Sequence, residues 1–70
     1  MPTLSYRITF YPKGGGAREE QWHTDAHEAW ETFRLFAEPD SFEMYYRVEL
    51  TEVNFEEQQD YPLATLEFPA

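Results

Sequence analysis

Apolar and polar residues alternate along the first segment of the chain. One set of alternate positions holds Leu4, Tyr6, Ile8 and Phe10, and the other holds Ser5, Arg7, Thr9 and Tyr11. Alternation with many aromatic or β-branched residues is typical of a half-buried strand, so we predict a strand over 3–11. Pro12 and the glycines at 14–16 then predict a hairpin loop, because proline cannot donate to a ladder and glycine accepts positive φ.

A second, more polar strand is predicted over 18–23. Glu20 and Trp22 share one face of it, and we assign Trp22 to the core. The many charges in this segment favour the edge of a sheet.

A helix is predicted over 25–37, with Thr24 as its N-cap. Acidic residues in its first turn suit the helix dipole, and Pro39 ends it. Its apolar positions recur at intervals of three and four residues and form one face: Ala26, Ala29, Trp30, Phe33, Phe36 and Ala37.

Two more strands are predicted over 42–53 and 61–68. In the first, alternation assigns one face to Phe42, Met44, Tyr46, Val48 and Leu50 and the other to Glu43, Tyr45, Arg47, Glu49 and Thr51. In the second, Ala64, Leu66 and Phe68 form the inward set, and Pro62 favours an edge or a strand start.

The element order β-β-α-β-β predicts an α+β fold with one helix on a four-stranded antiparallel sheet. The two most apolar strands, 3–11 and 42–53, are expected at the centre, which gives the order 2-1-3-4. The order 2-1-4-3 of a β-grasp-like domain stays open as the alternative. The predicted core is Leu4, Tyr6, Ile8, Phe10, Trp22, Ala26, Ala29, Trp30, Phe33, Phe36, Met44, Tyr46, Val48, Leu50, Leu66 and Phe68.

Composition narrows the class of protein. The 70 residues are 41% hydrophobic and 27% charged, which predicts a single folded domain over 1–70. The absence of cysteine excludes disulfides and cysteine-ligated metal sites. No apolar run is long enough to cross a membrane, and no basic region followed by an apolar one marks a secretion signal, so we expect a cytoplasmic protein.

The net charge of −9 is unevenly distributed. Residues 1–18 carry three cations and no acid, a charge of +3, whereas residues 19–70 carry 14 acids against two arginines, a charge of −12. Direct nucleic-acid binding needs a basic face, so we do not expect it. An acidic surface suits solubility, a basic protein partner or mimicry of nucleic acid.

Candidate chemistry is sparse. The glycine run joins two strands, whereas phosphate-binding glycine loops join a strand to a helix. His23 and His27 lie near acids, but they do not share one helical face as metal-binding pairs do. We therefore expect no catalysis, no cofactor and no metal. The alternative is a metal-dependent or hydrolytic enzyme that uses His23, His27 and nearby acids.

Two surfaces are candidates for protein interaction. The sheet face away from the helix is predicted to present Arg7, Tyr11, Tyr45 and Arg47, and tyrosine and arginine are enriched at interfaces. The end of the sheet near the helix start is predicted to gather Asp25, Glu28, Glu52, Phe55, Glu56, Glu57 and Asp60. The leading hypothesis is a small non-catalytic interaction module that binds a basic partner or a second copy of itself. Another alternative is an inhibitor that mimics nucleic acid and binds a basic protein.

Overall fold

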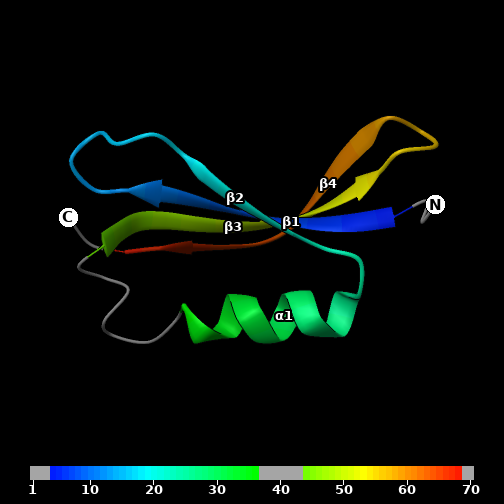
Figure 1. Cartoon of the computed structure of the whole chain (residues 1–70), viewed down its shortest axis with the longest axis horizontal. Helices are drawn as coiled ribbons and strands as arrows, with labels where there is room; N and C mark the ends of the chain where they lie inside the picture. Colours follow the sequence, from blue (N-terminus) through cyan, green and yellow to red (C-terminus); the bar gives the residue numbers. More distant parts are fainter. Residues whose placement is uncertain (1–3, 37–43, 69–70) are drawn as a thin grey trace.

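One antiparallel sheet of four strands is covered on one face by a single helix (Figure 1). The computed structural model describes residues 4–36 and 44–68. The elements in chain order are β1 (Leu4–Pro12), β2 (Glu19–His23), α1 (Ala26–Leu35), β3 (Tyr45–Asn54) and β4 (Gln59–Glu67). The strand order is β2-β1-β3-β4, and each neighbouring pair is antiparallel. The predicted α+β fold and strand order are thus confirmed, and the β-grasp-like order is wrong.

The core lies between α1 and the two central strands. Its buried members are Ile8 and Phe10 from β1, Ala29 and Phe33 from α1, and Val48 and Leu50 from β3. Burying an aliphatic or phenylalanine side chain of this size contributes roughly 1.5–3 kcal/mol. The hydrophobic alternation of β1 and β3 and the helical spacing of α1 predicted all six of these residues.

The helix begins one residue later than predicted. Asp25, and not Thr24, is the N-cap, because its backbone is extended and its Oδ1 accepts a hydrogen bond from the His27 N–H at 3.0 Å. The predicted end at Ala37 lies outside the described residues, and α1 itself ends at Leu35.

The register of the first hairpin places Trp22 on the face opposite the helix. Gly14 and Gly15 take φ of 83° and 80° in the loop, which L side chains rarely adopt. The loop sets Phe10 opposite Glu19, so that Trp22 lies opposite Arg7. Trp22 is 48% exposed, and its assignment to the core is wrong.

A β-bulge reverses the predicted faces at the start of β3. Tyr11 pairs with Arg47 and Pro12 pairs with Tyr45, which leaves Tyr46 as the extra residue. Tyr45 therefore packs on the core, whereas Tyr46 is 48% exposed. Met44 is 60% exposed, so the core assignments of Met44 and Tyr46 are both wrong. The predicted strand positions Phe42 and Glu43 lie outside the described residues.

Candidate functional site: the open face and the acidic end

The sheet face away from α1, called the open face below, carries three of the four interaction residues that were predicted for it. Arg7, Tyr11 and Arg47 lie there, because they alternate with core residues along β1 and β3. Tyr45 does not lie there, because the bulge at the start of β3 turns it toward the core. Tyr46 lies beside Tyr11 instead, with 5.8 Å between their ring centroids.

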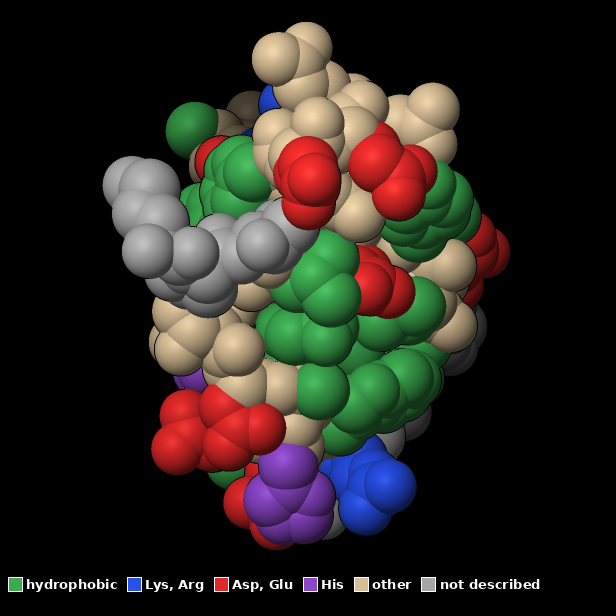
Figure 2. Space-filling view, turned by 90° about the vertical axis from the view of Figure 1, so that its right-hand side faces the viewer, with side chains coloured by type: hydrophobic (Ala, Val, Ile, Leu, Met, Phe, Trp, Pro, Cys, Tyr) green, Lys and Arg blue, Asp and Glu red, His purple; other side chains and the backbone are tan. Residues whose placement is uncertain are grey.

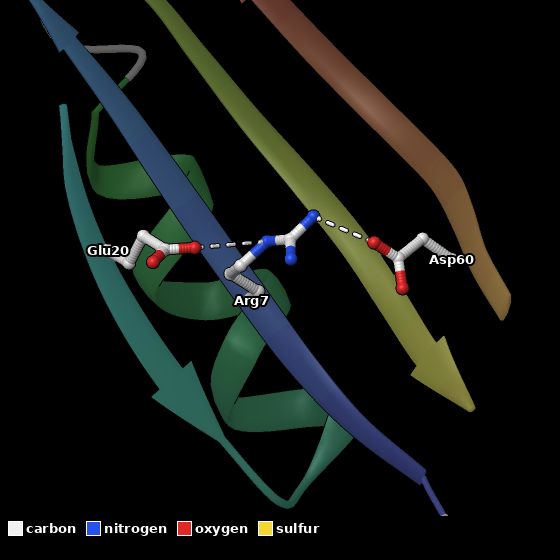
Figure 3. A network of polar contacts seen from close by, with 3 residues as sticks. All are labelled: Arg7, Glu20 and Asp60. Atoms are coloured by element: carbon white, nitrogen blue, oxygen red, sulfur yellow. Dashed lines mark hydrogen bonds and ion pairs between the residues drawn. The ribbon is translucent and has the colours of Figure 1, made fainter. Parts of the chain in front are cut away.

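Arg7 spans the open face from β2 to β4 (Figure 3). Its Nε lies 3.4 Å from Glu20 Oε2, and its Nη2 donates to Asp60 Oδ2 at 3.2 Å. The Nε contact is an ion pair without hydrogen-bond alignment, because this buried nitrogen has no hydrogen-bond partner. The guanidinium also lies 5.7 Å from the centroid of Trp22. Arg7 therefore ties together strands that are not neighbours.

Arg47 is neutralised in the same way at the other end of the open face. Its Nε lies 3.2 Å from Glu49 Oε1 and 3.9 Å from Glu67 Oε1, and its guanidinium lies 5.7 Å from the Tyr11 ring. Ser5, Thr9, Thr51 and Val53 are buried on this face, although no described helix covers it. The two arginines are thus engaged within the sheet, and the interaction potential of this face lies in its exposed rings.

We expect Arg7→Met to lower the free energy of unfolding by about 1 kcal/mol, because two carboxylates lose their shared cation while the aliphatic stem is kept. Salt screens the repulsion among the remaining acids, so the difference should shrink when urea unfolding is repeated at high ionic strength. Lys13→Met, which removes the same charge from an exposed loop position, is the matched control. Equal losses in the two variants would contradict the bridging role of Arg7.

The start of α1 and the turn between β3 and β4 lie at the same end of the molecule (Figure 1). The predicted acidic residues of both elements, Asp25 and Glu28 at the helix and Glu56 and Glu57 in the turn, therefore lie at this end, which is called the acidic end below. Figure 2 views it directly: hydrophobic side chains lie together in the middle, and acidic side chains lie above, beside and below them. The surface is therefore amphipathic as well as acidic.

The turn after β3 is built by its own polar side chains. Asn54 Oδ1 accepts from the Glu57 N–H at 3.0 Å, and Gln58 takes a positive φ of 55°. The Tyr61 hydroxyl donates to Glu57 Oε2 at 2.9 Å. This hydrogen bond is the first cause of the raised pKa of Tyr61, followed by desolvation and by the charges of Glu57 and Glu52. The Glu57 carboxylate is thus held in place by the turn.

Most carboxylates of the acidic end have no cation partner among the described residues. Asp60 pairs with Arg7, but no described arginine or lysine forms an ion pair with Asp25, Glu28, Glu56 or Glu57. This negative charge is therefore not neutralised by the described arginines and lysines.

An exposed aromatic pair adjoins this charge. Trp22 of β2 and Phe55 of the turn stack with ring centroids 6.2 Å apart and an interplanar angle of 23°. The two rings are 48% and 53% exposed. Trp22 lies on the edge strand β2, whereas Phe55 follows β3, on the other side of β1. The turn between β3 and β4 therefore curls across the open face to bring the two rings together. The sequence predicts Phe55 at this end but not the stack, because only the hairpin register brings Trp22 to this face.

Tyr45 packs against the core at the start of β3, beside Phe10 and Phe36. Its ring lies 5.3 Å from that of Phe10 and 6.1 Å from that of Phe36, and its hydroxyl donates to Glu19 Oε2 at 3.5 Å. Desolvation first, and then the charge and hydrogen bond of Glu19, raise the pKa of Tyr45 above its ordinary value of 10.0.

This raised pKa predicts an alkaline loss of stability. The unfolded chain ionises first, so the contribution is complete below pH 10 and is lost as the pH rises through the folded pKa. We expect the melting temperature of Tyr45→Phe to fall less steeply than that of the wild type above pH 10. Tyr46→Phe controls for loss of a hydroxyl at the adjacent exposed position, and equal slopes for Tyr45→Phe and wild type would refute this role.

The two histidines have separate partners. His23 Nε2 contacts Gln21 Oε1 at 3.1 Å, and His27 Nε2 lies 3.0 Å from Glu31 Oε1. Within residues 4–36 and 44–68, no three His, Asp or Glu side chains are grouped closely enough to hold a metal ion. A shallow, open depression of about 490 Å³ follows the flank of α1 and reaches β2 at His23.

No helix in the described part of the chain is both long and apolar enough to span a membrane. No protein-family model, curated protein or solved structure matches the chain. Its own surfaces therefore provide the indications of its function.

Proposed function

We propose that this protein is a non-catalytic interaction module that docks a basic segment of another protein at its acidic end. The Trp22–Phe55 stack beside carboxylates without described cation partners carries this proposal. Aromatic rings that are buried on binding supply much of an interface's affinity, and complementary charge supplies rate and selectivity. The rings distinguish such a surface from one that is only solubilising.

The proposal is tested with three lysine peptides of equal length and charge. One alternates lysine with valine, one places leucine among lysines at helical spacing, and one replaces the apolar residues with serine. We expect a peptide with apolar residues to bind about tenfold more tightly than the serine peptide, because only its side chains cover the Trp22–Phe55 stack, called the aromatic patch below. Calorimetry at two salt concentrations should show weaker binding at the higher one.

Matched variants locate the binding. Trp22→Ser and Phe55→Ser should each remove the preference for apolar residues, whereas Leu63→Ser, which truncates a 38% exposed side chain on β4, should not. Equal affinity for all three peptides, unchanged in the ring variants, would mean that net charge alone attracts them, and the proposal would fail.

A second copy of the chain is the other candidate occupant, supported by the half-exposed rings of Trp22, Tyr46 and Phe55. Repulsion between two molecules of charge −9 opposes it at low salt. Light scattering coupled to size exclusion separates the two cases: a monomer at low and high salt leaves the surface free, and a dimer under both conditions assigns it to self-association.

A further inference from the structure

The two edges of the sheet differ in their capacity to accept another strand. Pro62 in β4 has no N–H, and the register of β4 is broken next to Leu63. β2 has no proline and pairs regularly with β1 over all of Glu19–His23. Since β2 is the first strand in the sheet order, its outer edge presents backbone donors and acceptors that no described strand pairs.

From this edge, and resting on the proposed function, we infer a binding mode: a basic segment in extended conformation adds to β2 as a fifth strand. An added strand gains main-chain hydrogen bonds, and its alternate side chains point to opposite faces. The neighbouring surfaces must therefore receive side chains on both sides of β2.

The side of β2 that faces α1 has room for the side chains of an added strand. The depression of about 490 Å³ lies along the helix and is lined by His23, Glu28, Glu31, Thr32, Arg34 and Leu35. Leu35 is 67% exposed. Apolar surface next to Glu28 and Glu31 suits a lysine side chain, which buries its aliphatic stem and keeps its ammonium near a carboxylate.

The opposite side leads to the aromatic patch. Glu20 and Trp22 alternate with Gln21 along β2 and lie on the open face, where Trp22 stacks on Phe55. One extended segment on this edge would thus contact the depression with one set of side chains and the Trp22–Phe55 stack with the other.

Charge selects a basic occupant over a second copy of β2. Glu19 and Glu20 are exposed on this short strand. Pairing two copies through this edge would gather four glutamates, and like charges on neighbouring strands are destabilising. A strand that carries lysine or arginine meets the same carboxylates with favourable charge.

The test uses the peptide that alternates lysine and valine, in two N-methylated forms that block alternate sets of backbone amides. We expect methylation of the set facing β2 to weaken binding at least about tenfold and methylation of the other set to have little effect. Hydrogen exchange should slow at those β2 amides that point away from β1. Leu35→Ser should weaken binding, and Leu63→Ser on β4 is its matched control.

The outcomes separate this inference from the proposed function. Equal binding of both methylated forms, with no slowed β2 amide but a persisting effect of Trp22→Ser, would overturn strand addition and leave the proposed function standing. Preferential binding of the helical lysine–leucine peptide would also overturn it. If no peptide binds more tightly than the serine control, both the inference and the proposed function fail.

Discussion

Leu50→Ala is expected to lower the free energy of unfolding by about 3 kcal/mol, within the range for truncating a buried leucine. Leu50 is fully buried in β3, with Ile8 opposite it on β1 and Ala64 opposite it on β4. The small side chain of Ala64 cannot extend into the space that the leucine would leave. A domain of 70 residues has roughly 4–10 kcal/mol of stability, so this single cavity removes a large share.

Urea unfolding followed by circular dichroism measures this loss. Leu35→Ala is the matched control, because it makes the same substitution at a side chain that is 67% exposed on α1. Its effect should stay within about 0.5 kcal/mol. A similar, small loss in both variants would show that the β1–β3 layer is not the principal core.

Phe33→Ala should separate the helix from the sheet. Phe33 is 5% exposed, belongs to the core cluster and meets Trp30 edge-on at 6.0 Å between ring centroids. Truncating such a phenylalanine costs about 3–5 kcal/mol. A helix as short as α1, with 10 residues, is marginal in water without packing, so we expect its helicity to be lost.

The loss is visible as reduced ellipticity at the helical minimum and as fast amide exchange throughout α1. Phe55→Ala, at a ring that is 53% exposed on the opposite face, should keep wild-type helicity. If Phe33→Ala also keeps it, α1 is held by contacts other than this ring.

Periodicity predicted the fold because the central strands and the helix each bury one clear apolar set. Residues such as Ile8 and Phe33 have only one face on which burial is favourable. The strand order followed from the same contrast, because the most apolar strands gain most from central positions. Periodicity did not predict which residues face the helix in β2 and at the start of β3. In β2 only the loop geometry decides which face carries Trp22, and in β3 two adjacent tyrosines gave no indication of which one is the extra residue of the bulge.

The positions of the residues on the candidate surfaces could be predicted, but most of the contacts between their side chains could not. Alternation correctly placed Arg7, Tyr11 and Arg47 on the open face. Their pairing with Glu20, Asp60 and Glu67 depends on contacts between strands, which the sequence does not specify, whereas Glu49 lies two residues from Arg47 on the same strand. The Trp22–Phe55 stack likewise depends on how far the β3–β4 turn curls across the sheet.

The central position of β1 also constrains how the chain acquires its structure. β1 completes one edge with nearby β2, but its other edge pairs with β3, from Leu4 opposite Asn54 to Pro12 opposite Tyr45. Contacts between such distant residues form slowly, because a long intervening chain must first be closed into a loop. Because β1 precedes β3 along the chain, it is synthesised earlier and keeps one edge unpaired until β3 follows. In that interval the nascent chain is most exposed to aggregation.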